Sequence, residues 1–319
     1  MSGCLCTSYA RATEWAALAG ARWLGRGDEE AAEEAAAAAM KRGLNELPIA
    51  GRVIIGARSG EELLPDDTVG AGGDEVDLAL DPLEGRGVVA RGGTGAMSML
   101  AVAPPGALRR LPEMYMRTMA VGPLARDTID LERPVGENLR AIADSFGRTT
   151  SDITTIVLDR PRHHDLIEEI QAAGSRIKLI QDGTVTAAIS AAIRGTNDHL
   201  AIGIGGTRQA LLAAAALRCL GGGVQAQLWP TTRSQIDAAA AAGIDDVRQV
   251  FDEGALVSGD VIFVATGVSN GDLLRGVRYL ADSARTHSMI LCMRCNWVRF
   301  TDGIHFFARE RREEVRLLS

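Results

Sequence analysis

The sequence Asp81-Pro82-Leu83-Glu84-Gly85 marks the point where we expect a strand to turn out of a sheet. It follows residues 76–80, where apolar and polar residues alternate before the run becomes fully apolar, as in a half-buried strand. Because Pro82 has no N–H for the ladder, the strand should end there. Asp81 and Glu84 would then lie on one turn, either converging on a single Mg²⁺ or Mn²⁺ or remaining solvated as turn-capping acids.

The flanks of this turn carry a resemblance that extends over nearly the whole chain. The motifs, in order, are T-E-W-A-A-L-A-G (13–20), W-L-G-R-G-D (23–28), D-P-L-E-G (81–85), the small-residue run 96–102, P-E-M-Y-M (112–116), T-I-D-L (128–131), R-P-R-H (160–163), D-G-T-V (182–185), G-I-G-G (203–206) and A-T-G-V-S-N-G-D-L-L-R-G (265–276). Together they resemble class II fructose-1,6-bisphosphatases. The resemblance implies the α/β layered sandwich that this family shares with inositol monophosphatases, and a homodimer or homotetramer.

Composition excludes several other classes of protein. The chain has 319 residues, is 46% hydrophobic and carries a net charge of −7, so it can bury a core but has no electrostatic footprint for nucleic acid. No apolar run approaches the ~18 residues of a membrane helix. The first residues lack the charged and apolar regions of a signal peptide, and we expect a cytoplasmic protein that does not bind membranes.

The cysteines do not predict a metal site. Five cysteines without a secretory context predict reduced thiols. Cys292 and Cys295 form a lone C-x-x-C, and no second pair is placed to complete the four ligands of a structural zinc site. Cys4 and Cys6 lie near the chain end, where mobility is expected.

The order of expected elements predicts two domains, an α+β domain over residues 1–125 with the metal site and an α/β sugar-phosphate-binding domain over residues 126–319. In the first, helices are expected over 10–24 and 29–42, the second capped by Asp28 and stopped by Gly43. In the second, strands over 154–158, 176–180 and 199–204 alternate with helices over 161–173, 184–193 and 207–220. This alternation predicts a parallel sheet.

Three turns of the second domain are candidates for an anion pocket, because ligands of such sheets bind at the carboxyl ends of strands near helix N-termini. They are residues 160–162, 182–184 and 205–207, which supply forked arginine donors and glycine backbone. Surface ion pairs and tight turns explain the same residues equally well. The resemblance favours the pocket and implies a sugar-phosphate-binding set of Tyr115, Arg160, Arg162, Asp182, Gly183, Thr184 and Gly206. His163 and His164 are expected to pack at the surface of a helix start.

The resemblance also implies a metal site that this chain has altered. Metal ligands are expected at Glu33, Asp81 and Glu84, and catalytic roles at Asp81, Glu84 and Arg86, where Arg86 replaces a threonine that orients the attacking water. Two further ligand positions fall on Ala57 and Gln209, which offer no carboxylate; Glu61 or Glu62 could substitute. New cations, Arg58, Arg86 and Arg208, lie in or beside these positions and could neutralise a phosphate without metal.

These observations leave three functions open. The chain is a sugar bisphosphatase with weakened or altered activity that uses Mg²⁺ or Mn²⁺, or a sugar-phosphate-binding regulator without activity, or an enzyme that reuses the pocket for sugar-phosphate chemistry without metal. All three predict a small sugar phosphate as the ligand.

Overall fold

The structure is a computed structural model that describes residues 4–307. Its helices are η1 (Leu5–Thr7), α1 (Ala10–Ala21), α2 (Glu29–Asn45), α3 (Arg86–Ala90), η2 (Pro123–Ala125), α4 (Val135–Ser145), η3 (Thr150–Asp152), η4 (Pro161–His163), α5 (His164–Ala172), α6 (Thr184–Ala192), α7 (Thr207–Leu220), α8 (Arg233–Ala241) and α9 (Glu253–Leu256). Its strands are β1 (Ile49–Ile55), β2 (Thr68–Val69), β3 (Asp74–Glu84), β4 (Met97–Ala103), β5 (Tyr115–Val121), β6 (Thr154–Leu158), β7 (Arg176–Ile180), β8 (Leu200–Gly206), β9 (Gly223–Trp229), β10 (Val250–Asp252), β11 (Ile262–Gly267), β12 (Arg278–Tyr279), β13 (Ser283–Cys292) and β14 (Trp297–Phe306).

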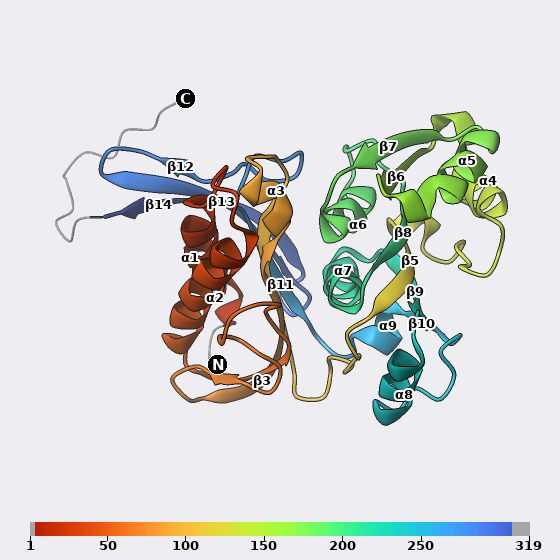
Figure 1. The fold of residues 1–319 in the computed structure, drawn as a ribbon. Helices are drawn as coiled ribbons and strands as arrows, with labels where there is room; N and C mark the ends of the chain where they lie inside the picture. Colours follow the sequence, from red (N-terminus) through yellow and green to blue (C-terminus); the bar gives the residue numbers. More distant parts are fainter. Residues whose placement is uncertain (1–3, 308–319) are drawn as a thin grey trace.

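These elements form five layers, with helices and sheets alternating (Figure 1). Helices α1 and α2 cover the outer face of the first sheet, α6 and α7 lie between the two sheets, and α4 and α5 cover the outer face of the second. The first sheet has the strand order β12-β13-β11-β4-β3-β1-β2, with β14 also paired to β13, and the second has the order β10-β9-β5-β8-β6-β7. The predicted α/β layered sandwich is confirmed.

The layering follows from strands that are apolar on both faces. Leu78 and Leu80 of β3 pack with α1 and α2 in one core, whereas Ala79 between them packs with α7 in another. Because successive side chains of a strand point to opposite faces, both faces of the sheet must be covered. A third core lies between the second sheet and α4, where Met119 and Leu139 are buried.

Strand β3 continues through Pro82 to Glu84, so the predicted end of this strand at Asp81 is wrong. Its pairing with β4 shifts register between Asp81 and Glu84, which are opposite Met99 and Met97. On the other side, the pairing with β1 ends at Ala79. Pro82 therefore lies in a bulge without a ladder partner, where its missing N–H costs no hydrogen bond.

Helix α2 begins as predicted and ends later than predicted. The Asp28 carboxylate accepts a hydrogen bond from the Ala31 N–H at 3.0 Å, which confirms the N-cap. Gly43 does not stop the helix, which continues to Asn45. A Cβ at residue 43 would lie 2.8 Å from the Ala12 Cα of α1, so this glycine permits close helix packing instead.

The second sheet is mixed rather than parallel. Strands β7, β6 and β8 run parallel, as the alternation predicts, but β5, β9 and β10 pair antiparallel. The chain also does not pass from the first sheet to the second just once, near Arg126. Strand β5, which precedes Arg126, already belongs to the second sheet, and strands β11–β14 at the end of the chain belong to the first. The division into domains 1–125 and 126–319 stays a prediction.

No helix within residues 4–307 has the length and apolarity needed to cross a bilayer.

Candidate functional site

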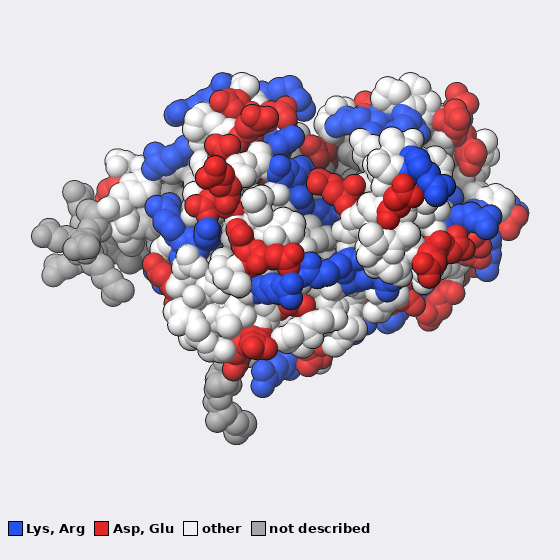
Figure 2. Space-filling model, turned by 60° about the horizontal axis from the view of Figure 1, so that its bottom comes forward, with Lys and Arg blue, Asp and Glu red and all other residues white. Residues whose placement is uncertain are grey.

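A cavity of about 710 Å³ opens where β6, β7 and β8 end. It brings together six of the predicted binding residues, which come from the three predicted turns and from β5: Tyr115, Arg160, Arg162, Asp182, Thr184 and Gly206. Gly183 lines a neighbouring cavity, where its φ of +90° caps the start of α6. Figure 2 shows basic side chains gathered along the line where the two halves of the molecule meet, with acidic side chains beside them.

The two turn arginines are positioned by backbone carbonyls. Arg162 Nη2 donates to the Ile204 carbonyl at 2.9 Å, and its guanidinium lies 5.1 Å from the centre of the Tyr115 ring. Arg160 donates to the carbonyls of Asp159, at 2.8 Å, and Gln181. A guanidinium has five N–H groups, so each arginine keeps donors for an anion while its orientation is held.

His163 supports this turn from inside the protein, which corrects its expected surface position. It is buried, and its Nε2 accepts the Ile204 N–H at 2.8 Å. Its Nδ1 must then carry the proton and donate to the Leu158 carbonyl at 2.9 Å. Burial lowers the pKa of His163, so the imidazole is neutral and ties β6 to β8.

The first of three buried carboxylates is Asp81 on β3, which contacts Arg58 and Gln209, two residues that line this cavity. Its side chain has no exposed surface, and its Oδ2 accepts hydrogen bonds from Arg58 Nη2 at 2.9 Å and Gln209 Nε2 at 3.1 Å. The pKa of Arg58 is raised, first by the Asp81 charge. Asp81 Oδ1 has no partner among the described residues. The carboxylate is therefore held through Oδ2 by one guanidinium and one amide.

Glu33 is held in the same way by Arg86. This carboxylate has no exposed surface and accepts from Arg86 Nη1 at 2.9 Å, the Arg58 N–H at 2.8 Å and Ser59 Oγ at 3.1 Å. Ser59 is a partner that the sequence did not reveal, because nothing in its spacing marks it. Gly85 makes this pairing possible, since its φ of +83° turns the chain from β3 into α3.

Glu84 differs from the other two carboxylates because no cation within residues 4–307 forms an ion pair with it. Its Oε1 accepts the Val185 N–H at the start of α6 at 3.2 Å, and Thr186 Oγ1 lies 3.5 Å from Oε2. Burial, followed by the nearby charges of Asp81 and Asp182, raises the pKa of Glu84 to about 8. Glu84 is thus mainly protonated at neutral pH.

Arg208, at the start of α7, lines the same cavity with unused donors. It is 8% exposed, and its Nε and Nη1 have no partner among the described residues. Burial lowers the pKa of this guanidinium, which reflects the cost of desolvating an unpaired charge. An anion in the cavity would supply the missing acceptors.

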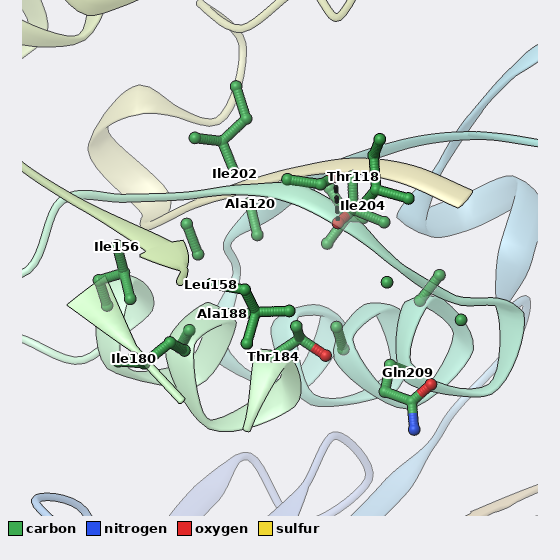
Figure 3. Close-up of a pocket in the computed structure, with 18 residues that line it drawn as sticks. Thr118, Ala120, Ile156, Leu158, Ile180, Thr184, Ala188, Ile202, Ile204 and Gln209 are labelled. Atoms are coloured by element: carbon green, nitrogen blue, oxygen red, sulfur yellow. Dashed lines mark hydrogen bonds between the residues drawn. The ribbon is translucent and has the colours of Figure 1, made fainter. Parts of the chain in front are cut away.

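A second, smaller cavity lies deeper, between β8 and the helices α6 and α7 (Figure 3). Its volume is about 30 Å³, which is room for one or two water molecules. Most of its walls are aliphatic, such as Ile156 and Ile202, and the polar side chains that line it are Thr118, Thr184 and Gln209. It is too small for a sugar phosphate, so the candidate site is the larger charged cavity.

The predicted metal ligands do not fit a divalent cation held by three carboxylates. Glu33 and Asp81 are each paired with an arginine, and Glu84 is turned toward the start of α6. Within residues 4–307, the only group of three or more acidic, histidine or cysteine donors close enough to share an ion consists of four cysteines elsewhere. Glu62 forms an ion pair with Lys41, so it does not substitute here.

The comparisons with known proteins agree with this architecture. A family model described as bacterial fructose-1,6-bisphosphatase, glpX-encoded, matches residues 4–305. The chain belongs to this family. Proteins named D-fructose 1,6-bisphosphatase class 2/sedoheptulose 1,7-bisphosphatase are 39% identical in Synechococcus sp. (strain JA-3-3Ab), over 92% of both chains, and 36% identical in Crocosphaera subtropica, over 92% of this chain and 93% of the relative. One from Microcystis aeruginosa is 35% identical over 95% of this chain and 96% of the relative. This chain therefore has the family scaffold, and two buried carboxylates of its candidate site are paired with arginines.

Proposed function

We propose that this chain binds a sugar bisphosphate in the 710 Å³ cavity and hydrolyses it weakly compared with its class II relatives. The names of the relatives point to fructose 1,6-bisphosphate and sedoheptulose 1,7-bisphosphate as the substrates to test. A cytoplasmic location and a homodimeric or homotetrameric assembly stay predictions from the family resemblance.

One phosphate would bind at the turn after β6. Arg160 and Arg162 carry unused N–H donors there, and Tyr115 forms the adjoining wall. Bidentate guanidinium–phosphate pairs are among the strongest charge-assisted hydrogen bonds. These residues would therefore supply most of the affinity and orient the sugar toward the buried carboxylates.

The second phosphate would lie near Arg58 and Arg208, which line the same cavity. Two guanidinium groups neutralise phosphate charge but do not generate a hydroxide nucleophile as a divalent metal does. Asp81 and Glu33 are fully buried and already paired, and this observation carries the proposal of weak hydrolysis. Binding of the bisphosphate would therefore be retained, without a requirement for Mg²⁺ or Mn²⁺, while the rate of hydrolysis would be reduced.

The test is phosphate release from both bisphosphates, measured beside a class II relative with Mg²⁺, Mn²⁺ or chelator. We expect release far below that of the relative. The double variant Ala57→Glu/Gln209→Glu restores two carboxylates, and metal-dependent release by this variant would support an intact scaffold with missing ligands. Release by the unmodified chain at the rate of the relative would contradict the proposal. Binding without any release by either form would favour the regulator or a different sugar-phosphate reaction.

A further inference from the structure

Four of the five cysteines meet at the end of the first sheet, although they are far apart in the sequence. Cys4 directly precedes the short helix η1 and Cys6 lies within it, while Cys292 ends β13 and Cys295 lies in the turn before β14. The four Sγ atoms all lie within 4.8 Å of one another. The expectation that no second pair would join the C-x-x-C is therefore wrong, because the antiparallel return of β13 brings the turn beside the N-terminal segment.

This cluster is remote from the sugar-phosphate cavity. In the sheet register, Cys292 is opposite Ile262, and Ile262 is opposite Val102. Glu84 is opposite Met97, at the other end of the same strands. Figure 1 shows the first described residues at one end of this sheet and α3, which follows Glu84, at the other. The cysteines are thus separate from the candidate active site.

The sulfur positions fit one tetrahedral ion. A Zn–S bond of about 2.3 Å requires sulfur–sulfur edges of about 3.8 Å in a regular tetrahedron. The Sγ atoms of Cys4 and Cys292 are 3.8 Å apart, and so are those of Cys6 and Cys295. These separations are far longer than the ~2.05 Å of a disulfide bond. A cubane iron–sulfur cluster needs wider spacing, because each thiolate then binds a different iron.

The surroundings are those of a closed structural site. Cys6 and Cys292 are each only 2% exposed, and the Cys295 N–H points at Cys292 Sγ with a distance of 3.3 Å. Such N–H groups stabilise the negative charge that four thiolates leave on a bound Zn²⁺. Four protein thiolates leave no open coordination position for substrate, which is typical of structural rather than catalytic zinc.

We propose that Cys4, Cys6, Cys292 and Cys295 bind one Zn²⁺ that fastens the N-terminal segment to the β13–β14 turn. The η1 segment is a single three-residue 3₁₀ turn, and Cys4 and Leu5 are only partly buried against the core. The ion would link residues nearly 290 positions apart, as the Cys4–Cys292 pair shows with a separation of 288. Ligands from both chain ends make the site dependent on the folded sheet.

The test is metal analysis of the full-length protein, purified under reducing conditions without chelator. We expect about one zinc per chain, and the double variant Cys4→Ser/Cys6→Ser should lose it. Cys219→Ser is the matched control, because Cys219 lies outside the cluster, where its thiol contacts the Val261 carbonyl. This control should keep its zinc.

A second measurement covers the case in which the double variant does not fold. The unmodified protein, stripped of metal and reduced, is titrated with Co²⁺, which should give the visible absorption of a tetrahedral thiolate site and be displaced by one equivalent of Zn²⁺. Absence of zinc after purification together with no thiolate absorption on adding Co²⁺ would overturn the proposal. So would one iron per chain, zinc retained by Cys4→Ser/Cys6→Ser, or zinc lost from Cys219→Ser.

Discussion

At the scale of single residues, the chemistry of the site is set by which charge each buried carboxylate faces. Asp81 and Glu33 are paired with Arg58 and Arg86, whereas the hydrogen-bond partners of Glu84 in the described part of the chain are a backbone N–H and a hydroxyl group. The sequence alone located these arginines near the acids, from their positions in the family motifs. The sequence could not predict which arginine pairs with which acid, because a salt bridge depends on the orientation of both side chains, and the spacing of motifs does not determine that orientation.

The Arg58–Asp81 pair predicts a large effect of Arg58→Ala on stability. Removing the guanidinium leaves a carboxylate with no exposed surface and without a countercharge. Such a loss should lower the free energy of unfolding by about 2–4 kcal/mol. The control Arg52→Ala removes a surface ion pair with Asp66. Both side chains of this pair are more than half exposed, so the variant should change stability little. Equal effects of the two variants in urea denaturation would contradict the assignment.

The raised pKa of Glu84 predicts a pH dependence with a definite sign. Its pKa is about 8 in the folded protein, and near 4.5 when unfolded, so between these values the folded state binds the extra proton. Stability should therefore fall as the pH rises from about 4.5 through about 8. Glu84→Gln keeps an acceptor for the Val185 N–H and should flatten this slope. If the unmodified protein and Glu84→Gln gave parallel curves of stability against pH between pH 6 and 8.5, Glu84 would be ionised throughout this range and the prediction would be wrong.

Arg162 predicts a local effect on ligand binding. Its guanidinium is oriented by the Ile204 carbonyl and lies in the cavity wall. Arg162→Ala should weaken binding of fructose 1,6-bisphosphate by about tenfold or more, the loss expected for a charge-assisted hydrogen bond. Arg140→Ala is the control, because Arg140 is exposed on α4 in the outer helical layer. Titration calorimetry checks both, and similar losses for the two variants would place the phosphate elsewhere.

At the scale of elements, the sequence predicts strongly patterned segments well and misses features that depend on a neighbour. The capped start of α2 and the strands β6 and β7 follow from local signals. The continuation of β3 through Pro82 does not, because it depends on a bulge against β4 and on where β1 ends. Strands β5 and β9 were missed for a similar reason, since their pairing partners come from distant parts of the chain.

The close contact of α1 and α2 predicts that Gly43→Ala is destabilising although alanine favours helices. The new Cβ would lie 2.8 Å from the Ala12 Cα, so the helices must move apart at a cost of about 1–3 kcal/mol. Gly136→Ala in α4 is the matched control, because its nearest neighbour would lie at an ordinary 3.6 Å. That variant should gain up to about 1 kcal/mol from helix propensity. A gain for Gly43→Ala in thermal unfolding would contradict the tight crossing.

At the scale of the whole molecule, the chain has the scaffold of its family, and two buried carboxylates within it are paired with arginines. The layered fold could be predicted, because motifs along nearly the full chain carry the resemblance. The assignment of strands to the two sheets could not be predicted, since β11–β14 pair in the first sheet although they follow all strands of the second. The same return creates the four-cysteine cluster, which neither C-x-C nor C-x-x-C reveals by itself.

The central claim is that arginines take over the role of metal in binding the sugar phosphate. Titration calorimetry with fructose 1,6-bisphosphate tests it most directly, with Mg²⁺, with Mn²⁺ and with a chelator that is used briefly and checked not to remove zinc. The account predicts the same affinity in all three conditions, because Arg58, Arg160, Arg162 and Arg208 supply the positive charge. Binding that appears only with Mg²⁺ or Mn²⁺ would contradict it and would mean that the carboxylates release their arginines to hold a metal.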